Sequence, residues 1–207
     1  MKNRQAELIQ QMTDRQLYLQ LILTQMILIG CAAILGFVLF SNWGELQEIY
    51  QLNDQRILTV GISAAMSVVL LDLVFIKLIP ERYFDDGGIN ERIFGSLSIP
   101  HIFLIAALVA VSEEFLFRGV IQTNWGLWVT SVIFAIFHIR YLSNWFLFAN
   151  ILLLSFFIGF IYQWTGNLLV TIMMHFVIDL LLGLIIHVRV KHGVIVSQGE
   201  EKAESNE

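Results

Sequence analysis

One stretch decides the fold of this chain: Ile102-Phe103-Leu104-Ile105-Ala106-Ala107-Leu108-Val109-Ala110-Val111-Ser112-Glu113-Glu114-Phe115-Leu116-Phe117-Arg118. Every residue before Ser112 is apolar, a pattern that is typical of a membrane-spanning helix. Two adjacent glutamates, Glu113 and Glu114, then follow inside the same run. An ionisable group at such depth costs at least about 2.5–3.5 kcal/mol on insertion. The two glutamates therefore indicate a functional site within a span.

The composition of the whole chain indicates an integral membrane protein. Of its 207 residues, 57% are hydrophobic and 14% are charged, and the mean hydropathy is +0.73. Soluble domains carry about 25% charged residues. The net charge of −5 provides no basic face, so we expect no nucleic-acid partner. A single cysteine, Cys31, excludes an intramolecular disulfide and a cysteine-based zinc cage.

We predict an all-α fold, a polytopic bundle of transmembrane helices. A span needs about 20 apolar residues, and candidate segments lie near residues 17–40, 57–79, 99–119, 126–140, 144–163 and 167–188. Six helices are the simplest count. The fourth segment is short, and it could be tilted, broken or buried among the others, so the count carries a margin of one.

The distribution of positive charge predicts the orientation of the bundle. Cytoplasmic loops are enriched in Lys and Arg, and a cytoplasmic N-terminus puts ten of the twelve basic residues on the inner side. These ten are Lys2, Arg4, Arg15, Lys77, Arg82, Arg92, Arg140, Arg189, Lys191 and Lys202. We therefore expect a multi-pass protein of the cell membrane with both termini in the cytoplasm and an even number of spans.

Helical spacing gives the two glutamates different tasks. Glu114 and Arg118 are four residues apart, so their side chains meet on one helix face and can neutralise each other. Glu113 is turned about 100° away from that face. A carboxylate in this position is a candidate general base. The alternative is a structural Glu114–Arg118 pair beside a glutamate that faces a water pocket.

Two further apolar segments carry histidines. His175 and Asp179 share a helix face in the last span, and His138 follows Phe134 by four residues near the end of the fourth segment. A rise of about 1.5 Å per residue puts Glu113, His175 and His138 about 10, 12 and 18 Å from the outer boundary. Helix tilt can close those differences. A lone histidine is usually a packing residue, but this group of histidines and carboxylates predicts one shared site.

The ordered motifs Glu-Glu-x-x-x-Arg at 113–118, Phe-x-x-x-His at 134–138 and His-x-x-x-Asp at 175–179 resemble the CPBP family. This family, also called Abi, comprises intramembrane CAAX prenyl proteases and bacteriocin-processing enzymes. The resemblance covers about residues 99–188 and implies a catalytic core made of the last four helices. Residues 1–98 then form a two-span region with an amphipathic lead and a polar loop, and residues 189–207 form an acidic tail, which we expect to be disordered.

The resemblance implies an intramembrane endopeptidase with a role for each motif residue. Glu113 activates a water molecule and His138 binds the same water, while His175 and Asp179 steady the developing oxyanion. Glu114 and Arg118 hold the first helix of the core, and Phe134 supports His138. The implied substrate is a membrane-associated peptide or protein, of which a prenylated CAAX tail is the family's best-known example, and lipid is the surrounding partner.

The family resemblance is compatible with a zinc-dependent mechanism and with a metal-free one. Glu113, His138, His175 and Asp179 offer oxygen and nitrogen ligands that Zn²⁺ accepts, whereas a metal-free glutamate mechanism is also attributed to the family. An ionised Asp179 cannot donate a hydrogen bond to an oxyanion. It is therefore protonated, or binds metal, or orients His175, and we favour orientation.

Two other classes of function stay open from the sequence. Some relatives are thought to be non-catalytic bacteriocin-immunity or scaffold proteins of the membrane. Carboxylates and histidines in facing spans also suit an ion or proton transporter, although the chain shows no internal repeat of the kind that many transporters use.

Overall fold

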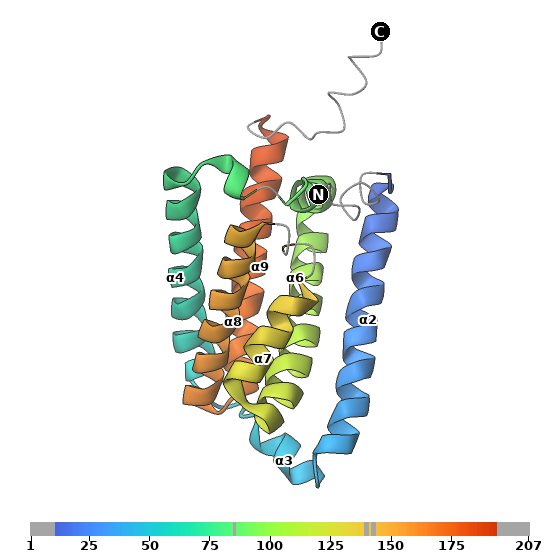
Figure 1. Cartoon of the computed structure of the whole chain (residues 1–207), viewed down its shortest axis with the longest axis vertical. Coiled ribbons are helices and arrows are strands. Elements are labelled where there is room, and N and C mark those ends of the chain that lie inside the picture. The colour runs from blue at the N-terminus through green and yellow to red at the C-terminus, as the bar shows by residue number, and fades with distance from the viewer. Residues whose placement is uncertain (1–10, 85, 139–140, 142–143, 194–207) are drawn as a thin grey trace.

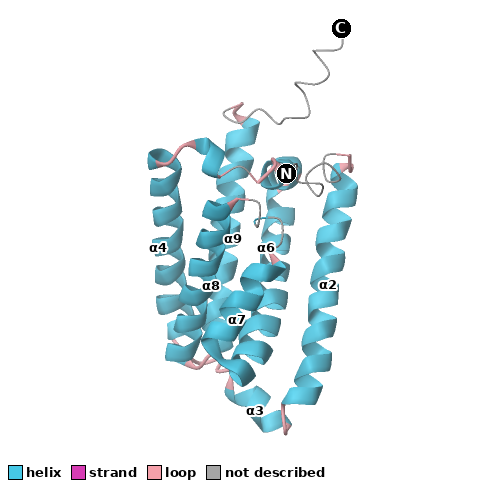
Figure 2. Ribbon diagram, in the orientation of Figure 1, coloured by secondary structure: helices cyan, strands magenta, loops and turns pink. Residues whose placement is uncertain are grey.

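The computed structural model describes residues 11–84, 86–138, 141 and 144–193, and this part of the chain contains helices and turns but no strand (Figure 2). The predicted all-α polytopic bundle is confirmed. The elements in chain order are α2 (Asp14–Leu39), α3 (Trp43–Glu48), α4 (Arg56–Leu78), η1 (Glu81–Tyr83), α5 (Ile89–Ser96), α6 (Ile99–Glu114), η2 (Phe115–Gln122), α7 (Thr123–Phe137), α8 (Trp145–Thr165) and α9 (Leu168–Lys191).

The number of membrane-spanning runs lies within the predicted margin of one. Within the described residues, five helical runs are long and apolar enough to cross a membrane, because α6, η2 and α7 form one run, Ile99–Phe137. The run bends at Gly126, whose φ of 80° and ψ of 173° suit only glycine. After the bend, α7 turns back toward the end from which α6 came and stops well short of it (Figure 1). The part of α7 after the bend, residues 127–137, extends about 16 Å, less than a full span of about 30 Å.

The helix α9 lies at the centre of the bundle, between α4, α6 and α8 (Figure 1). One buried cluster joins α4, α8 and α9 through Ala65, Ile158 and Met174, which are all fully or almost fully buried. Small residues allow the close approach of α4 to α9, since a Cβ on Gly61 would lie 3.0 Å from the Val170 carbonyl oxygen. This packing holds α9 rigidly where it presents its polar face to α6.

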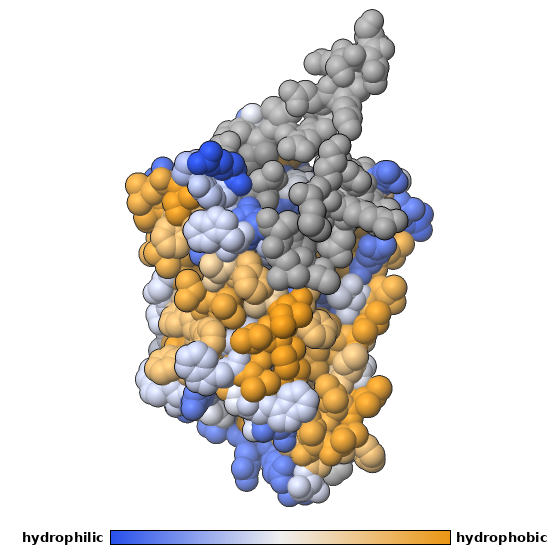
Figure 3. All heavy atoms as spheres, viewed as in Figure 1, coloured by the Kyte–Doolittle hydropathy of each residue, from blue (hydrophilic) through white to orange (hydrophobic). Residues whose placement is uncertain are grey.

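The helix α2 packs at the edge of the bundle. It buries four residues, Leu17, Gln25, Leu28 and Ala32, against α5, α6 and η2. The rest of its surface is strongly apolar and exposed, and Phe37 is 83% exposed. Apolar side chains cover much of the visible face between hydrophilic groups at both ends (Figure 3). A surface of this kind matches a lipid environment.

The described ends of the bundle helices lie on the same side. Asp14 begins α2 and Lys191 ends α9 at the upper end in Figure 1. This arrangement agrees with an even number of crossings when the short return of α7 is counted. The side of the membrane on which that end lies stays a prediction. Of the tail predicted over residues 189–207, residues 189–191 form the end of α9, and residues 194–207 lie outside the described ranges.

Candidate active site

Three helical elements bring the predicted polar residues together. Glu113 and Glu114 end α6, His138 caps α7, and His175 and Asp179 lie one turn apart on α9. A π-helix, η2, starts directly after Glu114. Its wider turns are often found at functional sites. The expectation that the residues from separate spans can meet is confirmed by the distances between their side chains.

The pairing of Glu114 with Arg118 is confirmed. Nη1 of Arg118 lies 3.1 Å from Oε1 of Glu114, and both side chains are fully buried. The same guanidinium donates to the backbone oxygen of Ser155 at 3.0 Å and to its hydroxyl at 3.1 Å. It also lies over the Phe134 ring, 4.7 Å from the centroid. Arg118 therefore joins the α6 end of the site to α7 and α8, and Phe134 packs against it as well as against His138.

Glu114 does more than neutralise Arg118. Nδ1 of His175 lies 2.9 Å from Oε1 of Glu114, so the imidazole donates its Nδ1 proton to this carboxylate. Nε2 of His175 lies 3.5 Å from Oδ2 of Asp179. The shorter contact belongs to Glu114, which is fully buried and fixed by Arg118. The residue assigned from the sequence to helix support alone thus also orients a site histidine.

The geometry of Glu113 and His138 suits a bound water. Nδ1 of His138 lies 2.9 Å from the Phe134 carbonyl oxygen, and this contact requires the proton on Nδ1. In the neutral ring Nε2 is then an acceptor, and it lies 4.0 Å from Oε2 of Glu113. Two acceptors at this separation do not bond each other. Their separation is compatible with one water molecule that donates to both atoms.

The site residues fall into a fully buried group and a partly exposed group. The side chains of Glu114 and Arg118 are fully buried, whereas those of Glu113, His138 and Asp179 are 11%, 20% and 28% exposed. Solvent and substrate can thus reach the second group but not the first. The buried pair holds the position of the residues that line the accessible edge.

The residues do not form a zinc site of the usual kind. In the described part of the chain, no group of three or more His, Cys, Asp or Glu side chains is arranged as metal ligands. A catalytic zinc requires three protein ligands. Nδ1 of His175 is already directed to Glu114, so this nitrogen is not available to bind a metal.

A further polar contact next to the site was not predicted from the sequence. The Ser112 hydroxyl donates to Oε1 of Gln25 on α2 at 2.5 Å, and both residues are buried. The sequence does contain a sign of this contact, because Gln25 is a polar residue within an apolar span. Ser112 directly precedes Glu113, so this bond joins α2 to the residue beside the candidate base.

Comparisons with known proteins indicate the family to which this chain is similar. A family model described as "Type II CAAX prenyl endopeptidase Rce1-like" matches residues 95–181. This range contains Glu113, Glu114, His138, His175 and Asp179. The chain is 43% identical over 185 residues to the "Uncharacterized protein YpbD" of Bacillus subtilis (strain 168), a match that covers 87% of this chain and 98% of the relative. No solved structure matches the chain.

Proposed function

Because the chain belongs to the CPBP family of Rce1-like intramembrane CAAX proteases, we propose that it hydrolyses a peptide bond with a water molecule held between Glu113 and His138. The observation that carries the proposal is the 4.0 Å separation of Oε2 of Glu113 and Nε2 of His138. Both atoms accept hydrogen bonds, and together they orient the two protons of one water away from the substrate. The water oxygen then directs a lone pair at the scissile carbonyl.

The proposed reaction starts when Glu113 takes a proton from the water as its oxygen attacks the carbonyl carbon. This general-base step contributes typically 10²–10⁴-fold to the rate. The tetrahedral intermediate carries the negative charge on the former carbonyl oxygen. Glu113 then gives its proton to the departing amine nitrogen, the C–N bond breaks, and the products are an amine and a carboxylic acid, which loses its remaining proton to water.

His175 is the proposed stabiliser of the oxyanion. Its Nδ1 proton is directed to Glu114 at 2.9 Å. A ring protonated on both nitrogens would have the Nε2 proton available for the substrate oxygen, with Asp179 3.5 Å away to orient it. Donors aimed at a developing oxyanion are worth about 2.7–4 kcal/mol in hydrolases. The fixed contact between Glu114 and Arg118 keeps the imidazole in place without reorganisation.

The proposed substrate is a peptide at or in the membrane. Glu113 and Asp179 lie inside helical runs that are long enough to span the bilayer, so a segment that reaches them must itself enter the lipid region. A prenylated CAAX-like tail meets this requirement, because its lipid anchors the peptide near the site. Other membrane-associated peptides meet it as well.

The test is a comparison of Glu113→Gln and His138→Ala with the wild type in purified, liposome-reconstituted protein. Both variants should lose cleavage of membrane peptides, and Glu113→Gln should lose it with its melting temperature within a few degrees of the wild type. Lys77→Gln, which changes a charge at the end of α4, is the control and should keep activity. A Glu113→Gln protein that retains full biological effect in cells would support the scaffold or immunity function instead.

A further inference from the structure

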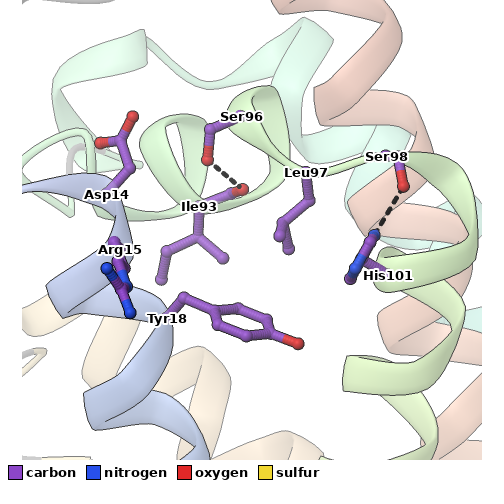
Figure 4. A pocket seen from close by; sticks show the side chains of 8 residues that line it. All are labelled: Asp14, Arg15, Tyr18, Ile93, Ser96, Leu97, Ser98 and His101. Carbon is purple, nitrogen blue, oxygen red and sulfur yellow. Dashed lines mark hydrogen bonds between the residues drawn. The ribbon is translucent and has the colours of Figure 1, made fainter.

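A cavity lies away from the proposed active site. Its volume is about 540 Å³ and it is lined by Arg15 and Tyr18 of α2, by Ile93 of α5, and by Leu97 and His101 near the start of α6 (Figure 4). This volume is within the roughly 300–1,000 Å³ of small-molecule sites. His101 precedes Glu113 by twelve residues, or about 18 Å along the helix. The cavity is therefore separate from the residues proposed for catalysis.

The cavity presents a cationic side chain that is not used elsewhere in the described structure. Asp14 also lines it, but its carboxylate is paired with Arg92 at 2.9 Å. Arg92 donates in addition to the Met12 carbonyl oxygen at 2.6 Å, so it is held on the α5 side. Arg15 forms no ion pair with any residue in the described ranges. Its guanidinium can bind a phosphate group through two parallel hydrogen bonds.

His101 adds a second polar group on the opposite wall. Its Nδ1 lies 2.7 Å from the Ser98 hydroxyl, which fixes the ring, and the Tyr18 ring meets it edge-on at 6.4 Å. The second ring nitrogen turns toward Tyr18 and the space between α2 and α6 (Figure 4). The imidazole and the Tyr18 hydroxyl can therefore donate to other oxygens of an anionic headgroup whose phosphate Arg15 binds from the α2 side (Figure 4).

The position and the lining of the cavity favour the headgroup of a lipid over a free anion. It lies at the end of the bundle where α2 begins and α9 ends, next to the short helix α5 (Figure 1). Polar groups line its rim, and Ile93 and Leu97 provide an apolar wall beside them. An anionic headgroup attached to an acyl chain uses both kinds of surface. We propose that this cavity binds the phosphate group of an anionic phospholipid and thereby joins α2 to α5 and α6.

The test is lipid retention by the full chain in detergent, measured by native mass spectrometry with phosphatidylglycerol or phosphatidylcholine. The wild type should retain phosphatidylglycerol in preference to phosphatidylcholine. Arg15→Gln should lower that retention about fivefold, since one basic group near a membrane surface contributes about that factor in affinity. His101→Gln should lower it as well. Arg15→Lys should restore part of it, and Lys77→Gln, at the same end of the bundle, should leave it unchanged.

Three results would overturn the proposal. The first is equal retention of both lipids by the wild type. The second is a loss in Lys77→Gln as large as in Arg15→Gln, which would show attraction by net charge only. The third is full displacement of phosphatidylglycerol by inorganic phosphate at millimolar concentration, which would identify a site for a free anion. Thermal unfolding of each variant shows whether the fold is intact, and none of these readouts depends on peptidase activity.

Discussion

Oε1 of Glu114 accepts a hydrogen bond from Nδ1 of His175 at 2.9 Å, across the interface between α6 and α9. The same oxygen accepts from Arg118 at 3.1 Å. One buried carboxylate oxygen thus holds a site histidine and the cation that anchors the π-helix. Any change to Glu114 is expected to affect both stability and activity.

Glu114→Gln should destabilise the protein strongly. The substitution keeps the shape of the side chain but leaves the fully buried Arg118 without its counter-ion. Removing one partner of a buried pair costs about 3–5 kcal/mol. Denaturant or thermal unfolding in detergent measures this loss. Replacing both residues by apolar side chains in one protein should recover much of the stability but not the peptidase activity, because His175 still lacks its acceptor. Equal activity in the double variant and the wild type would contradict the orienting role of Glu114.

Asp179→Asn should keep most of the activity. The contact from His175 to Asp179 is 3.5 Å, longer than the contact to Glu114, so the ring stays oriented after the change. The amide of the variant can also donate a hydrogen bond to an oxyanion, which an ionised Asp179 cannot. Asp179→Leu, which has no polar atom, is the matched comparison and should lose activity. Complete inactivity of Asp179→Asn would rule out an orienting role and favour a charge requirement at this position.

Gln25→Leu should lower activity more than stability. Hydrogen bonds between membrane helices contribute about 0.6 kcal/mol on average, so the loss of the bond from Ser112 changes the unfolding free energy little. Ser112 is adjacent to Glu113, and its release changes the position of the base. We expect kcat to fall while KM changes little in assays of the reconstituted protein. Thr24→Val, an exposed neighbour on α2, is the control. If Gln25→Leu and Thr24→Val lower kcat equally, the hydrogen bond from Ser112 to Gln25 does not position Glu113.

The loop before α4 should make stability depend on pH in the acid range. Hydrogen bonds from Arg56 lower the pKa of Asp54 from 3.8 to about 2. Since the folded-state pKa is depressed, the stabilisation is present above pH 3.8 and is lost as the pH falls toward about 2. Asp54 also accepts a hydrogen bond from Asn167 at 3.1 Å, at the start of α9. Melting temperatures measured across this range should fall less steeply in Asp54→Asn than in the wild type, and identical slopes would contradict the assignment.

The sequence predicted the helical segments and the side chains that are neighbours on one helix. Spacing of four residues required Glu114 to meet Arg118 and His175 to meet Asp179, because the geometry of one helix fixes such neighbours. The break that the segments 99–119 and 126–140 predicted is present as the bend at Gly126, whose backbone conformation the hydropathy pattern does not specify. The structure thus contains both predicted segments, 99–119 and 126–140, and joins them through η2 and this bend.

The sequence by itself determined that the chain is a helical membrane protein, and that carboxylates and histidines lie in its spans. Both results follow from local properties, the hydropathy and the helical repeat. Only the tertiary structure decided which partner each group has. The contacts of His175 with Glu114 and of Gln25 with Ser112 join residues 61 and 87 positions apart. Such contacts depend on the rotation and depth at which helices pack, and helical periodicity within one segment does not contain that information.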